Sequence, residues 1–205
     1  MRSKLGTLCP SALSLIVTAL LPSLSSGQVP VFTILKAESK ITFNVKASVA
    51  LVGTFDQSEA TLRFTSADAE SGVLEIKIQA ASVNTGSGMK NGKLKSQDFF
   101  DVQHNPMITF ISKKIVPISQ DKVRIEGDFT IRGVSKTETL TMTIVRDADG
   151  TGGRIEGEMA FDRKDYGMNH GIPFIKIADR VQVNVNLVGK RISGPPVQIK
   201  VKPGA

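Results

Sequence analysis

Residues 181–187 read Val-Gln-Val-Asn-Val-Asn-Leu, a strict alternation of apolar and polar side chains. Successive side chains of a β-strand point to opposite faces of a sheet, so this period of two predicts a strand with one apolar and one polar face. The same alternation occurs in residues 140–144 and 155–161 and recurs along most of the chain from residue 41 onward, while no segment holds a long helical period. The chain is therefore predicted to be all-β.

Turn sequences separate the alternating segments at the spacing of β-hairpins. They are Ser71-Gly72, Gln120-Asp121, residues 133–136 and residues 147–150. An open sheet of about eight such strands would leave two exposed edges, so an antiparallel meander closed into a barrel with its apolar face inward is favoured. A two-sheet sandwich is the alternative. Residues 83–106 interrupt the alternation and predict a long loop with a short helical turn, in which Phe99 and Phe100 cap the barrel.

The N-terminal residues have the pattern of a secretory signal peptide. Arg2 and Lys4 precede an apolar run from Leu13 to Leu21, and small residues follow at positions 25–27. At about 1.5 Å per residue, a helix of this run is too short to cross a ~30 Å hydrocarbon layer. We therefore expect removal of residues 1–27, one domain over residues 28–193, and a C-terminal extension over residues 194–205. The mature protein would be periplasmic or secreted.

The composition excludes several kinds of chemistry. The single cysteine, Cys9, lies in the segment expected to be removed, so the mature chain offers no thiol for a disulfide, a nucleophile or a metal site. The chain has 26 Lys and Arg against 19 Asp and Glu but no basic helix with interleaved aromatics, which suggests anionic lipid or solubility rather than nucleic acid. His104 and His170 match no metal or nucleophile pattern. We expect no catalytic residue, no metal and no cofactor.

Five blocks of sequence carry a resemblance to a known family. Residues 95–110 contain Asp-Phe-Phe-Asp-Val followed by Asn-Pro-Met-Ile-Thr-Phe, and residues 127–136 read Gly-Asp-Phe-Thr-Ile-Arg-Gly-Val-Ser-Lys. With residues 39–46, 81–86 and 161–168, these blocks resemble the YceI-like family of secreted bacterial lipid-binding proteins, in the family's order. The resemblance implies a lipocalin-like barrel whose interior holds a long isoprenoid or another amphiphilic lipid, with a homodimer as a weaker expectation. It implies a binding protein and not an enzyme.

The inward apolar side chains are the predicted lining of the ligand site. They are Phe43, Phe55, Phe64, Ile76, Phe110, Phe129, Ile131, Met142, Met159 and Phe161. Any filled barrel also buries such residues, so plain core is the alternative for each. The candidates for contacts with a polar head group are Lys90, Lys93, Lys95, Arg132, Arg163 and Tyr166. Solvated or structural roles are the alternatives for these six.

The sequence thus predicts a binding protein that sequesters or transports a long-chain amphiphile, such as a polyisoprenoid or a quinone, with transient contact to a membrane surface. A ligand-free structural or stress-related interaction module with a filled barrel is the alternative. A hydrolase or isomerase acting on isoprenoids is a third hypothesis, and it would require a catalytic role for His104 or His170.

Overall fold

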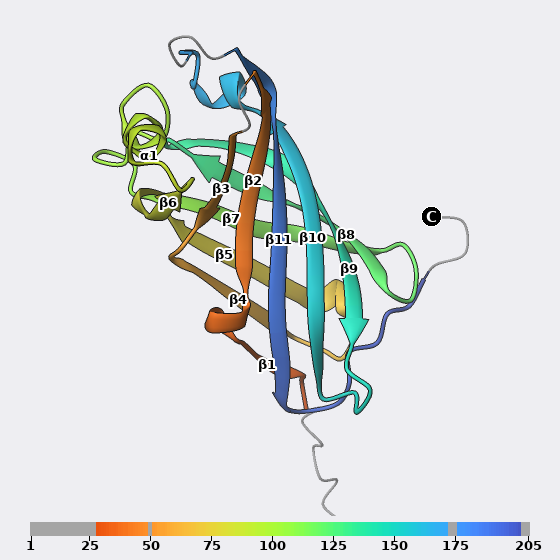
Figure 1. The fold of residues 1–205 in the computed structure, drawn as a ribbon. Helices are drawn as coiled ribbons and strands as arrows, with labels where there is room; N and C mark the ends of the chain where they lie inside the picture. Colours follow the sequence, from red (N-terminus) through yellow and green to blue (C-terminus); the bar gives the residue numbers. More distant parts are fainter. Residues whose placement is uncertain (1–27, 49–50, 172–175, 202–205) are drawn as a thin grey trace, which may run out of the picture.

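A computed structural model describes residues 28–48, 51–171 and 176–201, and its strands wrap into a barrel (Figure 1). The predicted signal peptide lies outside the described residues. The elements are β1 (Val31–Ile34), η1 (Lys36–Glu38), β2 (Lys40–Ala47), β3 (Leu51–Phe55), β4 (Ser58–Phe64), η2 (Ala69–Ser71), β5 (Gly72–Gln79), η3 (Ala80–Ser82), β6 (Val83–Asn84), α1 (Gly88–Lys95), β7 (Met107–Pro117), β8 (Lys122–Ile131), β9 (Val134–Arg146), β10 (Gly152–Asp162), η4 (Arg163–Tyr166) and β11 (Ile177–Ser193).

Eight strands form a closed antiparallel ring. The order is β1-β4-β5-β7-β8-β9-β10-β11, and β11 pairs back to β1. The predicted all-β barrel of about eight strands is confirmed. Because the ring of strands is closed, the alternative of a two-sheet sandwich is excluded. The predicted short helix is also present, as α1 within the long loop.

The meander has a branch that the sequence did not predict. Strand β11 has 17 residues, and β1 pairs with only its last part, from Gly189 to Ser193. The earlier part of β11 pairs with β2, which forms a hairpin with β3, and β3 in turn pairs with the two residues of β6. Two N-terminal strands therefore share one long edge, because β11 extends well beyond either of them.

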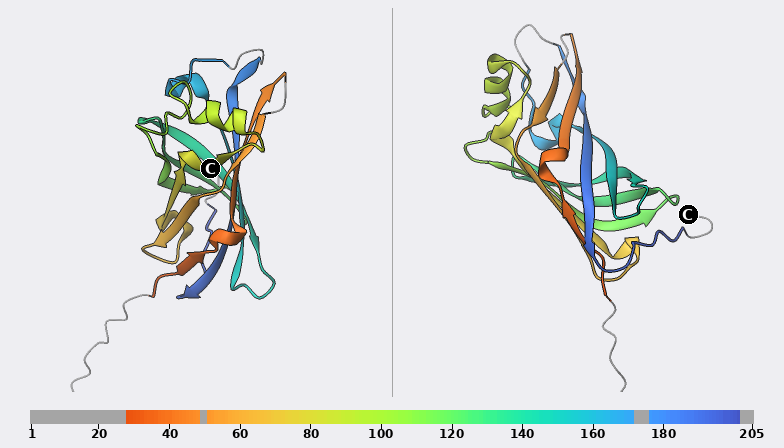
Figure 2. Two further views of the ribbon diagram at one scale, coloured as in Figure 1. Left: turned by 60° about the vertical axis from the view of Figure 1, so that its left-hand side comes forward. Right: turned by 60° about the horizontal axis from the view of Figure 1, so that its bottom comes forward.

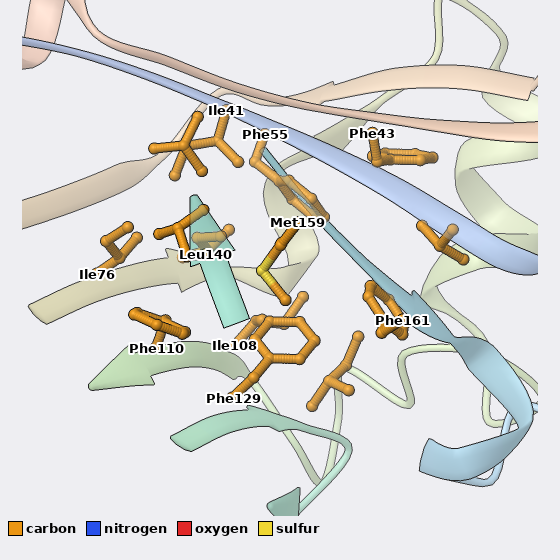
Figure 3. Close-up of a cluster of buried hydrophobic side chains, with 14 of the residues drawn as sticks. Ile41, Phe43, Phe55, Ile76, Ile108, Phe110, Phe129, Leu140, Met159 and Phe161 are labelled. Carbon is orange, nitrogen blue, oxygen red and sulfur yellow. The ribbon is translucent and has the colours of Figure 1, made fainter. Parts of the chain in front are cut away.

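The apolar faces of the strands meet inside the barrel (Figure 3). The part of the barrel away from α1 is tightly filled. Leu74, Ile125, Leu140, Met142 and Leu187 are each at most 2% exposed there. This packing is the principal source of stability, since a fully buried aliphatic side chain contributes about 1.5–3 kcal/mol.

Several connections gather at the other end of the barrel. Figure 2 shows α1, the adjoining ends of β2 and β3, and the η4 turn at this end, which we call the cavity end. Helix α1 begins after Ser87, whose hydroxyl accepts a hydrogen bond from the Lys90 amide. The segment from residue 85 to residue 106 lies across this end and is here called the cap. It includes α1, whose N-terminus is stabilised by the Ser87 hydroxyl.

The C-terminal extension contacts the barrel through a short parallel bridge. The Gln198 amide donates to the Ala67 carbonyl, and the Ala69 amide donates to the Gln198 carbonyl. Ile199 is buried at 7% exposure, and Lys200 forms an ion pair with Asp68. The described part of this segment is therefore packed against the turn between β4 and β5.

Gly127 in β8 provides a test of this packing. A Cβ atom there would lie 2.5 Å from the Ile111 carbonyl oxygen and 2.7 Å from the Phe110 ring. Gly127→Ala should therefore lower the free energy of unfolding by about 1–3 kcal/mol, as overpacking does. Gly92 in α1 has nothing within 4 Å of its Cβ position, so Gly92→Ala should be neutral or stabilising. Urea denaturation of both variants measures the difference. Equal stabilities would show that β7 does not pack closely against Gly127.

Candidate functional site: an apolar cavity under the cap

An apolar cavity of about 60 Å³ lies inside the barrel at the cavity end. Among the described residues that line it, only Arg163 carries a polar side chain. The cavity is far smaller than the roughly 300–1,000 Å³ of typical ligand pockets. In this closed state it could hold a small part of a hydrocarbon chain and no more.

Five of the ten predicted lining residues contact this cavity. They are Phe43, Phe55, Phe129, Ile131 and Phe161. Four others are buried core residues that do not line it, namely Ile76, Phe110, Met142 and Met159. Phe64 is half-buried, with its ring centre 5.8 Å from that of Phe32 near the opposite end. Alternation identified the inward face correctly, but it does not give the height of a residue along the barrel axis.

The cap supplies lining residues that alternation did not indicate. Leu94, the one buried residue of α1, contacts the cavity together with Phe99 and Phe100. The Phe100 ring packs on Phe55, with 5.8 Å between the ring centres. The cap therefore closes the cavity with apolar side chains. The isolated leucine in a lysine-rich helix was the available signal for Leu94.

Ile41 lies between this cavity and a second pocket. A pocket of about 280 Å³ opens between η1 and β4, and both cavities include Ile41 in their lining. Ile41 itself is 1% exposed. The side pocket lies where β4 leaves β1, after the single paired position Val31–Arg63. Ile41 therefore forms a partition between the two spaces.

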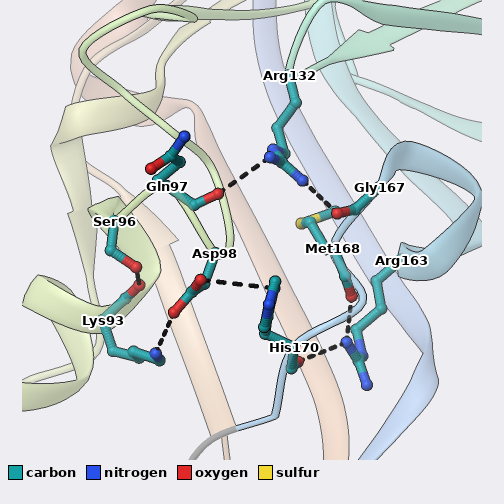
Figure 4. A network of polar contacts seen from close by, with 9 residues as sticks. All are labelled: Lys93, Ser96, Gln97, Asp98, Arg132, Arg163, Gly167, Met168 and His170. Atoms are coloured by element: carbon teal, nitrogen blue, oxygen red, sulfur yellow. Dashed lines mark hydrogen bonds and ion pairs between the residues drawn. The ribbon is translucent and has the colours of Figure 1, made fainter.

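Polar contacts fix the cap to the neighbouring turns (Figure 4). Arg132 donates hydrogen bonds from one guanidinium to the Gly167 carbonyl and to the Gln97 carbonyl, the latter at 3.0 Å. The Asp98 carboxylate pairs with Lys93, and its other oxygen lies 3.5 Å from His170 Nδ1. The hydrogen bond from Lys93 lowers the pKa of Asp98, and the nearby charges of His170 and Arg132 add to this effect. Asp98 is therefore ionised at neutral pH.

Arg163 has a structural set of partners. Its guanidinium donates to the carbonyls of Met168, His170 and Ala178 and to the carboxylate of Asp179. Asp179 also bonds Lys164, which is the largest cause of its lowered pKa. Arg163 is 6% exposed. It therefore organises the turn after β10, although its stem contacts the cavity.

Tyr166 fills a separation between two strands. The pairing of β9 with β10 stops at Thr141 and Glu158. Beyond that point the Tyr166 ring packs edge-on against Phe129 and Phe161, with centre distances of 5.4 and 5.2 Å. Its hydroxyl donates to Glu138 at 2.9 Å. Burial, first, and then this bond raise the pKa of Tyr166 well above its ordinary value, so the phenol stays neutral.

The three candidate lysines lie on α1 but do not line the cavity. Lys93 is engaged by Asp98, and Lys90 and Lys95 are partly exposed. Both histidines are largely exposed, and His104 Nδ1 lies 2.9 Å from Asp101. Among residues 28–48, 51–171 and 176–201, no group of three or more His, Cys, Asp or Glu side chains could hold a metal. In the same part of the chain, no helix has the length and apolar character needed to cross a bilayer.

The fold and the cavity define a closed eight-stranded antiparallel barrel with an apolar cavity at one end. The sequence model of the YceI-like domain family matches residues 32–189 of this chain. The chain belongs to the YceI-like family, and the resemblance carried by the five sequence blocks is confirmed.

Individual relatives support this assignment. A protein of Azotobacter vinelandii named UPF0312 protein is 27% identical over 122 residues, which cover 58% of this chain and 64% of that protein. The crystal structure of Burkholderia cenocepacia BcnA matches with a TM-score of 0.69 and 28% identity, over 76% of this chain and 99% of BcnA. A polyisoprenoid binding domain from Saccharophagus degradans, implicated in plant cell wall breakdown, has the same fold, with a TM-score of 0.62 and 18% identity over 79% and 99% of the two chains. The chain thus spans less than two thirds of the Azotobacter relative.

The bridge made by Arg132 predicts how firmly the cap is held. A lysine ammonium cannot span two carbonyls as a planar guanidinium does, so Arg132→Lys should release one contact. We expect amide hydrogen exchange in residues 94–102 to accelerate about fivefold, the equivalent of about 1 kcal/mol. Arg124→Lys, at an exposed position of β8, the strand that ends just before Arg132, should leave exchange in the cap unchanged. Equal exchange in both variants would show that Arg132 does not hold the cap.

Proposed function

We propose that the protein binds an amphiphilic lipid of the polyisoprenoid or quinone type, holds its apolar chain under the cap, and carries it in the periplasm or outside the cell. The observation that carries this proposal is the cavity, whose lining by the described part of the chain is apolar except for Arg163. A site without spare polar groups suits a hydrocarbon chain, since each buried methylene contributes about 0.8 kcal/mol. The Saccharophagus domain, described as polyisoprenoid binding, supports the same ligand class.

The small volume of the cavity determines how such a ligand would enter. A chain of several isoprene units exceeds 60 Å³, so the cap must move aside or the rings of Phe43 and Phe100 must rotate. Leu94, Phe99 and Phe100 are the side chains that would separate from the barrel. The same small volume favours the second candidate function, a ligand-free interaction module. Native mass spectrometry of the protein purified gently from its own host separates the two, because a retained lipid supports carriage and its reproducible absence supports the filled barrel.

A cavity-filling variant tests where the hydrocarbon chain of the lipid binds. Val45 lines the cavity from β2, and Val52, on the adjoining strand, is 53% exposed. Val45→Phe should occupy the space and weaken the binding of farnesol by at least about tenfold. The control variant Val52→Phe should bind as the wild type does. Fluorescence displacement or calorimetry gives the affinities, and unchanged binding by a folded Val45→Phe protein would place the ligand elsewhere.

Ile41 provides a test of how far the hydrocarbon chain of the bound lipid extends. Removing this partition should join the cavity to the side pocket and admit additional methylenes. Ile41→Ala should therefore improve the affinity for the long prenol solanesol relative to farnesol by roughly tenfold, the equivalent of two buried methylenes. Ile125→Ala, a buried residue lining neither pocket, controls for general loosening of the core. A preference for chain length that changes equally in both variants would contradict the partition.

A further inference from the structure

Charge is distributed unevenly along the barrel axis. The segments that form the cavity end are residues 46–48, 84–106, 131–136, 162–171 and 176–180, and they contain ten Lys and Arg but five Asp and Glu. The rest of the described chain contains thirteen basic and fourteen acidic residues. The net positive charge of the described protein is therefore confined to one end, which gives this end an attraction for anionic surfaces.

The lysines at this end come from separate segments. Lys46 lies at the end of β2, and the Ser48 amide donates to the Lys176 carbonyl at 2.9 Å, which brings Lys176 to the same tip. Lys95 is in the last turn of α1, a helix that contains no acidic residue. Lys46 and Lys176 are exposed, and Lys95 is partly exposed. The positive charge thus spans the end of β2, the start of the segment that leads into β11, and the cap.

An apolar side chain stands out in the same region. Met89, in the first turn of α1, is 87% exposed. This is the highest exposed fraction of any large apolar side chain in the described residues. On the same helix, Leu94 points inward and is buried at 4% exposure. Helix α1 therefore presents one apolar residue to the barrel and another to solvent, with lysines between them. Basic residues beside an exposed apolar side chain are the composition that binds the interface of an anionic bilayer.

We propose that the cavity end docks on an anionic membrane surface, with Met89 inserted among the lipids and Lys46, Lys95 and Lys176 against the phosphates. A lipid surface is favoured over nucleic acid for two reasons. The region combines positive charge with the exposed side chain of Met89, and its described residues include no exposed aromatic ring on which a base could stack. The docked orientation places the cap, and the cavity beneath it, at the bilayer. The inference goes beyond ligand binding, because it requires only the outer surface of the protein.

Vesicle flotation tests the electrostatic part of the proposal. The full chain should bind vesicles of phosphatidylglycerol and phosphatidylcholine in equal parts, and should not bind phosphatidylcholine alone. The triple variant Lys46→Gln, Lys95→Gln, Lys176→Gln should bind about a hundredfold more weakly, since each basic residue near the surface contributes roughly fivefold. The control triple variant Lys114→Gln, Lys122→Gln, Lys190→Gln makes the same change in net charge away from this end. It should lose less than about twofold, because charges beyond a Debye length are screened.

The absence of tryptophan from the chain permits a direct test of insertion. Met89→Trp places a single fluorophore on α1, and its emission should shift to shorter wavelength when anionic vesicles are added. Ile192 is 64% exposed at the opposite end of β11. Ile192→Trp is therefore the matched control, and its emission should stay unchanged.

Three results would overturn the proposal. One is equal loss of vesicle binding in the two triple variants, and another is an equal emission shift at both tryptophan positions. The third is failure of the folded wild type to bind anionic vesicles, whether or not it retains a lipid in its barrel. Ligand retention is measured separately by mass spectrometry, so failure of docking and failure of lipid carriage are distinguishable.

Discussion

Closure of the ring by the pairing of β1 with β11 is the constraint on which the rest of the structure depends. Strand β1 has only four residues, yet it covers the edge of β11 from Gly189 to Ser193 and adjoins β4. Without it, two strands would expose unpaired backbone groups to solvent and to other chains. Because β1 is short, the remaining edge of β11 is free for β2. The barrel therefore closes fully at one end and carries the β2–β3 hairpin at the other.

The position of the cavity follows from this division. Where the ring is complete, facing side chains such as Leu140 and Leu187 fill the interior to near-complete burial. Where strands separate, other groups must complete the wall. Tyr166 does so between β9 and β10, with its hydroxyl on Glu138 and its ring against two phenylalanines. The cap does so at the end. An incomplete wall closed by side chains and loops leaves space that a continuous β-ladder does not.

The sequence predicted the barrel because alternation and turn chemistry are local signals. The predicted turns at Gln120-Asp121 and residues 147–150 lie between successive strands, whereas residues 134–136 already belong to β9 and Gly72 begins β5. Phe99 and Phe100 close the cavity as expected. The branch at β11 was not predictable, since alternation gives the face of a strand but not its neighbours. Alternation also does not give the height of a residue along the barrel axis, so it did not show that Phe110 lies in the filled part while Phe129 lines the cavity. Arg163, predicted as a head-group contact, has its donors directed to three carbonyls and Asp179, which only the folded turn reveals.

The energetics of the cap set a minimum length for the proposed ligand. Separating Leu94, Phe99 and Phe100 from the barrel exposes three buried apolar side chains, at about 1.5–3 kcal/mol each, or roughly 5–9 kcal/mol in all. The polar contacts of Arg132 and Asp98 add less, about 1 kcal/mol for a hydrogen bond of Arg132, because they lie at a partly exposed surface where water can replace them. A ligand recovers about 0.8 kcal/mol for each methylene that it buries, so roughly six to eleven carbons only offset the opening. Net affinity therefore requires a chain longer than that. Such a chain is larger than the cavity beneath the cap, so part of it must occupy the space that Leu94, Phe99 and Phe100 leave when the cap moves aside.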